Sequence, residues 1–185
     1  MVAQPPRFTI TALAPDGFDA FLVYLNDHLG DNGRDEQPYF QPLSRTASYF
    51  PPERADAFRR GLQQALGTPG WRRLWVARTA DGQIAGHIDL RAHPEPAATH
   101  RCMLGMGVGR HWRRHGLGRQ LIAHARLWAS HVALVWIDLQ VLSVNQPALS
   151  LYQHSGFETT GVTPDMFRLD GHSFSYTAMS LHLAD

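Results

Sequence analysis

Residues 100–118 read HRCMLGMGVGRHWRRHGLG, and this stretch combines a strand, a turn and the start of a helix. From Leu104 to Gly109 apolar side chains alternate with glycine, and a period of two is typical of a strand. Glycine inside a strand indicates a bulge or the close approach of another backbone. The helix that follows begins among arginines, and the free N–H groups of a helix N-terminus can hold a phosphate. The stretch therefore predicts a ligand-contacting strand followed by a phosphate-binding turn.

Composition limits the class of protein. The 185 residues match the usual size of one domain, about 100–200 residues, so we expect a single domain over 1–185. Seventeen basic and sixteen acidic residues leave a net charge of +1, which gives no electrostatic support to nucleic-acid binding. Cys102 is the single cysteine, which excludes an intramolecular disulfide and fits a reducing compartment.

The sequence also predicts no membrane or metal association. The N-terminal residues have no apolar signal core, and the longest apolar tract, 132–142, is far shorter than the roughly 20 residues of a membrane span. Eleven histidines are present, but the spacings His111/His115 and His124/His131 have no matching carboxylate or cysteine ligands. We therefore expect a cytoplasmic protein that binds no membrane and no metal.

Hydrophobic periodicity predicts a mixed α/β (α+β) fold of about seven strands and about four helices. The predicted order is strand, two helices, three strands, helix, strand, helix and two strands. Strands are expected at 8–13, 73–78, 83–91, 100–108, 134–141, 166–169 and 173–183, and helices at 18–29, 53–66, from 117 onward, and from 145 to 156.

The segment between the first two helices contains turn formers together with Tyr39, Phe40, Tyr49 and Phe50. Long loops rich in aromatic residues often serve as binding lids. The same composition also suits a loop that is packed down by its own aromatic side chains. The sequence favours neither interpretation.

Three segments resemble the GNAT superfamily of acetyl-CoA-dependent N-acetyltransferases. Arg113-x-x-Gly116-x-Gly118 is similar to the family's Q/R-x-x-G-x-G/A loop after the fourth strand. Residues 141–157, VLSVNQPALSLYQHSGF, resemble its V-x-x-x-N-x-x-A-x-x-L-Y-x-x-x-G-F segment, and residues 168–183, RLDGHSFSYTAMSLHL, resemble its closing hairpin. The motifs cover 83–183. Residues 85–108 look most like bacterial enzymes that acetylate free amino acids or similar small amines.

The resemblance implies a fold in which strands four and five splay apart and hold acetyl-CoA in the gap. It implies that the main chain of the fourth strand pairs with the pantetheine arm and that the turn wraps the pyrophosphate. Asn145 would hydrogen-bond the CoA arm, and Tyr152 would protonate the departing thiolate as general acid. The implied cosubstrate-binding residues are Met106, Gly107, Val108, Arg113, Arg114, His115, Gly116, Leu117, Gly118, Arg119 and Asn145.

The resemblance does not identify a general base in this sequence. The positions where family members carry a catalytic glutamate hold Cys102 and Gln140 in this sequence. His100 and His87 are candidate substitutes because histidine titrates near neutrality. A third alternative is that the amine loses its proton to solvent through ordered water.

The acceptor is expected to be the primary amine of a small molecule, possibly a free amino acid, acetylated by direct attack in a ternary complex. Tyr39, Phe40, Tyr49 and Phe50 would form an apolar pocket, and Arg34, Arg45 or Arg91 would pair with a carboxylate. The alternatives are an acceptor that is a protein N-terminus, a lysine or an aminoglycoside, and a non-catalytic acyl-CoA-binding sensor. A homodimer is a further possibility implied by the resemblance.

Overall fold

The computed structural model describes residues 7–35 and 37–183, which form one seven-stranded mixed sheet in the order β1-β2-β3-β4-β5-β7-β6. The parallel pair is β4 with β5, and the remaining neighbours are antiparallel. The expected fold class is therefore confirmed. The strands are β1 Thr9–Ala12, β2 Arg72–Arg78, β3 Ile84–Ala92, β4 Arg101–Val108, β5 Trp136–Leu142, β6 Glu158–Leu169 and β7 His172–His182; the main helices are α1 Phe18–Leu29, α2 Pro52–Gln63, α3 Leu117–His131 and α4 Gln146–His154.

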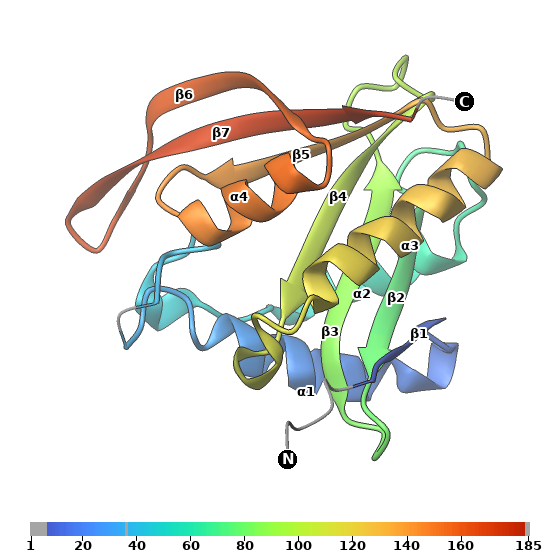
Figure 1. Ribbon diagram of the computed structural model, residues 1–185, viewed down its shortest axis with the longest axis horizontal. Coiled ribbons are helices and arrows are strands. Elements are labelled where there is room, and N and C mark those ends of the chain that lie inside the picture. The colour runs from blue at the N-terminus through green and yellow to red at the C-terminus, as the bar shows by residue number, and fades with distance from the viewer. Residues whose placement is uncertain (1–6, 36, 184–185) are drawn as a thin grey trace, which may run out of the picture.

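Helices cover both faces of the sheet. In Figure 1, α3 crosses one face of β2, β3 and β4, whereas α1 and α2 lie behind the same strands. Leu121 and Ile122 of α3 are buried with Ile88 and Leu90 of β3, in the core that also contains Tyr152 of α4. The opposite face of the sheet packs on a second cluster from α1, α2 and β2. The odd-numbered residues of β3 and β4 face this second side.

The strands β4 and β5 separate soon after they meet. They pair between Arg101–Met103 and Trp136–Asp138, and the rest of β5 pairs with β7 alone. Figure 1 shows the two strands diverging from this contact. The splay implied by the resemblance is therefore present, and β4 has an unpaired edge from Leu104 to Val108.

Strand geometry determines which groups line that edge. The amide of Gly109 donates to the carbonyl of Ala85, one residue beyond the Gly86–Val108 pair, so the main chain of Gly109 points toward β3. Main-chain groups of successive residues point to opposite sides of a strand, and the β3–β4 register is unbroken. The main chains of Met106 and Val108 therefore point toward the gap, whereas that of Gly107 points toward β3.

Several expected boundaries were wrong. The strand expected at 166–169 begins eight residues earlier, at Glu158, because bulges around Gly161 and before Phe167 absorb residues that interrupt a regular ladder. Helix α2 ends at Gln63, since Gln64 is already extended with a ψ of 143°. The strand expected from His100 begins at Arg101.

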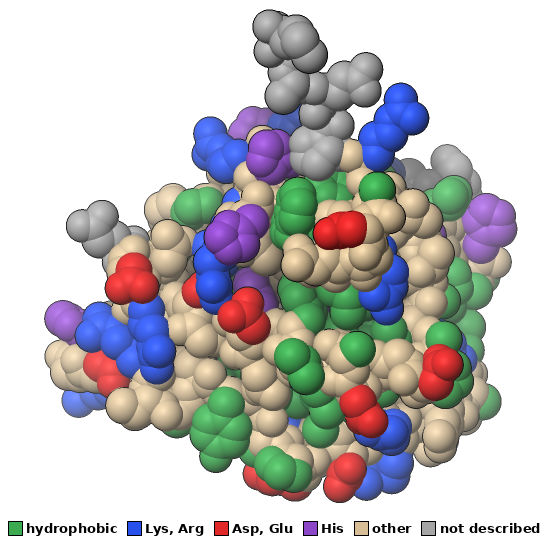
Figure 2. Space-filling model, turned by 90° about the horizontal axis from the view of Figure 1, so that it is seen from below, with side chains coloured by type: hydrophobic (Ala, Val, Ile, Leu, Met, Phe, Trp, Pro, Cys, Tyr) green, Lys and Arg blue, Asp and Glu red, His purple; other side chains and the backbone are tan. Residues whose placement is uncertain are grey.

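Charge is mixed over the surface. Figure 2 shows arginine side chains interspersed with acidic ones on the face seen from below, in keeping with the net charge of +1. Among the helices of the described residues, none has the length and apolar character that a membrane crossing requires.

The packing of α3 gives a stability prediction. Leu121 is 0% exposed, and its replacement by alanine leaves a cavity between α3 and β3, so we expect Leu121→Ala to lower the free energy of unfolding by about 2–5 kcal/mol. Leu127 lies on the same helix and is 62% exposed, so Leu127→Ala serves as the control and should change the stability by less than about 0.5 kcal/mol. Urea unfolding measures both, and equal losses would contradict the assigned packing.

Candidate functional site

The turn before α3 has the geometry of an anion site. Gly116 is the N-cap of α3 with a φ of 77°, and Arg114 has a φ of 67°, so the chain turns sharply through left-handed conformations. The first amides of a helix have no partner within it and point out of its N-terminus. Gly118 has a different role, since a Cβ there would lie 2.8 Å from Leu151 of α4. It permits α3 and α4 to pack closely.

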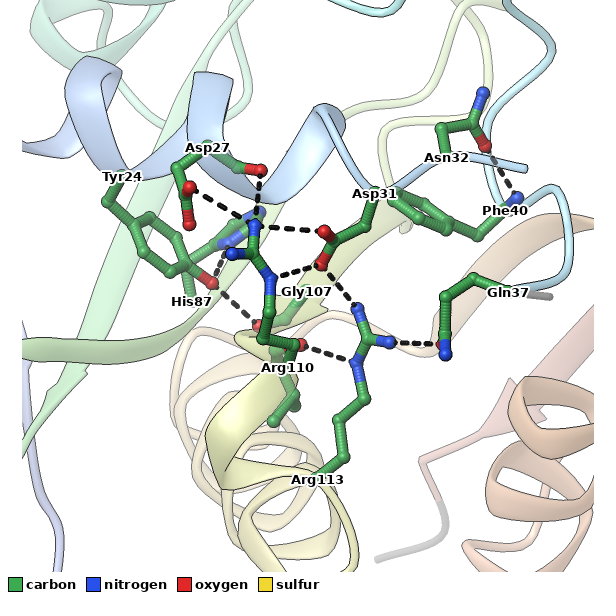
Figure 3. Close-up of polar contacts among 11 residues, drawn as sticks. Tyr24, Asp27, Asp31, Asn32, Gln37, Phe40, His87, Gly107, Arg110 and Arg113 are labelled. Carbon is green, nitrogen blue, oxygen red and sulfur yellow. Dashed lines mark hydrogen bonds and ion pairs between the residues drawn. The ribbon is translucent and has the colours of Figure 1, made fainter. Parts of the chain in front are cut away.

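Arg113 turns away from this helix N-terminus. Its Nε donates to the carbonyl of Val108 at 3.1 Å, and its other nitrogens contact Gln37 at 2.6 Å and Asp31 at 3.3 Å. Arg110 also contacts Asp31, at 2.8 Å between Nη2 and Oδ1 (Figure 3). The two arginines therefore connect the turn to the end of α1, and the Arg113 side chain is held by protein groups.

Polar side chains cover the two glycines of β4 on the α1 side. A Cβ on Gly107 would lie 2.5 Å from Nε2 of His28 and 2.7 Å from Cε1 of His87. A Cβ on Gly105 would lie 2.5 Å from Oδ1 of Asp89 and 3.2 Å from an Arg91 nitrogen. Residues with side chains at these positions would displace those groups, so the glycines create room for polar atoms beside the unpaired edge.

The two histidines are neutral. His28 is stacked between Tyr24 and Phe40, and burial is the main cause that lowers its pKa to about 3. Burial also lowers the pKa of His87 to about 3, with the Arg72 charge as a further cause. The Tyr24 hydroxyl donates to the carbonyl of Gly107 at 3.2 Å and lies 3.2 Å from Nδ1 of His87 (Figure 3). A group with so low a pKa is a weak proton acceptor for an ammonium ion.

The Nδ1 atom of His28 is unusual. It is buried and has no hydrogen-bond partner among the described residues. An unpaired buried nitrogen costs free energy unless something satisfies it. The Nε2 edge of the ring faces Gly107, so the unpaired nitrogen lies on the opposite side of the ring.

Asp89 lies in a buried ion cluster next to this region. Its carboxylate is 3.2 Å from Arg72 and 3.4 Å from Arg91, and its side chain is 6% exposed. The Arg72 guanidinium also lies over the Phe58 ring, 3.9 Å from the centroid. In the part of the chain that the structure describes, one carboxylate therefore balances two guanidinium groups, and this cluster has a net positive charge.

Tyr152 and Asn145 lie on α4, on the β5 side of the gap. Tyr152 is buried against Phe157, and burial raises its pKa well above the ordinary value, so the phenol keeps its proton at neutral pH. The side chain of Asn145 accepts from the amide of Ala148 at 3.3 Å, which is a helix cap. Asn145 therefore caps α4, and its role in cosubstrate binding stays a prediction.

The remaining candidate base, His100, and the two residues at the glutamate positions of the family have unfavourable surroundings. His100 is exposed before β4 begins, and six residues of strand, at ~3.3 Å each, separate it from Met106. Cys102 is fully buried, and burial raises the pKa of its thiol to about 12. Gln140 is exposed on β5. None of the three brings a proton acceptor to the open part of the gap.

The aromatic loop between α1 and α2 is held in place by Asn32, which lies near the start of the loop. This residue is 0% exposed; its amide donates to Leu43 and Ser48, and its oxygen accepts from the amides of Phe40 and Gln41, at 2.8–3.0 Å. The structure therefore supports the interpretation of a packed loop for much of this segment.

The loop also contacts the closing hairpin. Tyr39 is buried beside Phe174, and its hydroxyl donates to Asp170 at 2.6 Å. The amide of Arg45 donates to the same carboxylate at 3.0 Å. Phe40 packs on His28, whereas Tyr49 is 55% exposed. Among the aromatic residues predicted for the acceptor pocket, Phe40 therefore contacts a polar group over β4, the His28 ring.

Sequence reasoning missed Tyr24, His28 and Asp89. The signal for Asp89 was readable, because His87, Asp89 and Arg91 alternate with Ile88 and Leu90 in β3, which places three polar groups on one face. The signal for Tyr24 and His28 was their i,i+4 spacing on α1. What they contact across the sheet depended on the tertiary fold.

The buried histidines give a pH prediction. In the unfolded chain each pKa returns to about 6.5, so between about pH 6.5 and about 3 the unfolded state binds more protons. Their contribution to stability is therefore complete above pH 6.5 and is lost as the pH falls through this window. We expect His28→Phe to make the free energy of unfolding depend less on pH between 7 and 5 than in wild type.

The exposed His131 provides the control, since His131→Phe should leave the wild-type pH dependence unchanged. Urea unfolding at both pH values measures the difference. An identical slope in wild type and His28→Phe would contradict the assigned neutral state of His28.

Comparison with known proteins agrees with this geometry. Residues 37–157 match the acetyltransferase (GNAT) family. The uncharacterised N-acetyltransferase YycN of Bacillus subtilis (strain 168) is 23% identical over 157 residues, covering 83% of this chain and 94% of YycN. A GNAT-family acetyltransferase from Streptococcus pneumoniae superposes with a TM-score of 0.77 at 21% identity, covering 96% of this chain and 100% of that one. A GCN5-related N-acetyltransferase from Kribbella flavida superposes with a TM-score of 0.73 at 21% identity, covering 95% of this chain and 97% of that one. Because the family match spans more than half of the sequence, this protein belongs to the GNAT family of acetyltransferases.

Proposed function

We propose that the protein transfers acetyl from acetyl-CoA to the primary amine of a small molecule, by direct attack in a ternary complex. The observation that carries the proposal is the free edge of β4. The main chains of Met106 and Val108 point into the gap where β5 has turned away to pair with β7. The Val108 carbonyl already accepts from Arg113, so the groups left for an extended pantetheine arm, which would pair as an added strand does, are the Met106 main chain and the Val108 amide.

The rest of the cosubstrate is assigned to the neighbouring elements. The amides from Arg114 to Arg119 at the N-terminus of α3 are proposed to hold the pyrophosphate. Asn145 at the start of α4 is proposed to contact the CoA arm. Gly107 is not retained as a main-chain ligand, because its main chain points toward β3 and its carbonyl accepts from Tyr24.

The proposed chemistry is a single displacement. The amine nitrogen attacks the thioester carbonyl carbon, and the N–H of Met106 stabilises the negative charge that develops on the oxygen. The C–S bond then breaks, and the thiolate takes a proton from the Tyr152 phenol, which stays protonated at neutral pH. We propose that the amine loses its own proton to water, because His87 is a weak base and His100 lies far along β4.

A small acceptor is favoured over a peptide by the contacts on the acceptor side. Asn32 fixes the loop over α1, and Asp170 of the closing hairpin accepts hydrogen bonds from Tyr39 and Arg45. The loop and hairpin are therefore joined beside the polar groups of β3. A long peptide would require those contacts to open, whereas a small amine would not.

The proposal predicts the result of an amine panel. Thiol release from acetyl-CoA is measured with free amino acids, simple amines, lysine-containing peptides and an aminoglycoside. We expect turnover with one or more free small amines and none above background with peptides. Turnover with peptides alone would overturn the small-molecule assignment. Tight CoA binding without turnover of any amine would favour the acyl-CoA sensor.

Tyr152→Phe tests the general acid. The substitution removes the hydroxyl and keeps the aromatic packing on Phe157, so we expect kcat to fall about 10²–10⁴-fold. The KM for acetyl-CoA and the thermal midpoint should stay near wild type. An unchanged kcat would remove Tyr152 from the chemistry, and a common loss of stability and activity would indicate a packing role instead.

A further inference from the structure

We propose that Arg91, held by Asp89 above Gly105, binds a carboxylate of the acceptor, so that the natural acceptor is a small amine that also carries an acid group. The inference rests on the proposed function and names the acceptor class for that site. It starts from the position of the guanidinium. An Arg91 nitrogen lies 3.2 Å from where a Cβ of Gly105 would be, directly over β4 and beside its unpaired edge.

The balance of charges around Asp89 leaves the Arg91 guanidinium available to bind an anion. Within residues 7–35 and 37–183, Asp89 is the single carboxylate paired with Arg72 and Arg91, at 3.2 Å and 3.4 Å. Arg72 is the more buried arginine, with its side chain 21% exposed, and it lies over the Phe58 ring. The Arg91 side chain is 35% exposed and shares only one nitrogen with Asp89. A guanidinium carries five N–H donors, so Arg91 keeps donors for an anion.

Arg91 also faces the far side of the gap. Its positive charge acts on Tyr176 of β7, opposing the effect of burial, which raises the Tyr176 pKa. Tyr176 belongs to β7, which pairs with β5 beyond the gap. The Arg91 charge therefore reaches from the polar face of β3 to the strands on the far side of the gap.

The other two candidate arginines are already used by the loop. Arg45 donates from Nε to the carbonyl of Gly33 at 2.7 Å and lies over the Tyr39 ring. Arg34 donates to the carbonyl of Arg45 at 3.2 Å. Both stabilise the loop that covers the acceptor side, whereas Arg91 belongs to a rigid central strand, where a binding group is held in place.

A polar group lies beside the Arg91 guanidinium on the same face of β4. The Nε2 edge of His28, which is 7% exposed, lies over the neighbouring Gly107. Gly105 and Gly107 are about 7 Å apart along the strand at ~3.3 Å per residue. A small molecule over Gly105 would therefore extend toward the His28 imidazole, and this polar surface suits a compact zwitterion better than an apolar amine.

The test compares each amino acid with its carboxamide, which keeps the shape and the amine but lacks the charge. In wild type we expect kcat/KM for acids to exceed that for amides by about 10–100-fold, the usual effect of a charge-assisted contact. In Arg91→Gln this ratio should fall close to one, with an unchanged KM for acetyl-CoA. Arg91→Lys, which keeps the charge, should retain part of the preference. Arg126 is exposed on α3, so Arg126→Gln is the matched control and should keep the full ratio.

Asp89 is a positioning residue in this proposal. Asp89→Asn removes the charge that orients Arg91, so the KM for acids should rise while the KM for acetyl-CoA stays constant. A purely structural role would instead lower turnover of acids and amides alike.

The outcomes separate this inference from the proposed function. Equal wild-type rates for acids and amides, or a ratio that survives in Arg91→Gln, would overturn the role of Arg91 and leave small-amine acetylation standing. Turnover of peptides alone would overturn the proposed function and this inference together.

Discussion

The gap between β4 and β5 determines which main-chain groups of the sheet stay free. A parallel pair that stops after Met103 leaves the outer edge of β4 without a partner strand, although the Val108 carbonyl still accepts from Arg113. Such groups are costly to bury, so a protein keeps them only where something else completes the ladder. The pairing of β5 with β7 and the close packing of α3 on α4 at Gly118 hold the strands apart.

The same opening explains the chemistry of the flanking residues. On the α1 face, neutral imidazoles and a shared carboxylate surround Gly105 and Gly107. On the other side of the gap, the Tyr152 phenol keeps its proton because it is buried. Charge in the region is therefore concentrated on a few arginines, of which Arg110 and Arg113 are paired with Asp31. Few charged side chains then remain that could select an acceptor by its charge.

Local sequence patterns predicted much of this fold but less of the site. Periodicity located the strands and helices, because the apolar faces of β3, β5 and α3 follow simple repeats. It failed at the start of β6, where Gly161 and Pro164 interrupt the pattern and bulges in the register restore the pairing with β7. The hydrophobic pattern of the sequence does not show where bulges will restore the pairing of two strands.

The glycines of β4 show the same limit within the site. Their positions predicted a close approach, and the groups that approach are the side chains of His28 and Asp89, from α1 and β3. Arg113 gives a second example. Its place in the motif predicted a phosphate contact, which stays a prediction, and its side chain contacts Asp31 and Gln37 across 76 or more residues of chain. Partners so distant in sequence are set by the tertiary fold.

The use of arginine throughout this region has a consequence for an enzyme of this class. The cationic groups near the gap, Arg72, Arg91, Arg110 and Arg113, are all guanidinium groups, and the sequence contains no lysine. A guanidinium stays charged at any physiological pH and is not an amine nucleophile. The positive side chains of this region are therefore not acceptors for an acetyl group, and a sequence without lysine offers an acetyltransferase none of its own lysine side chains to modify.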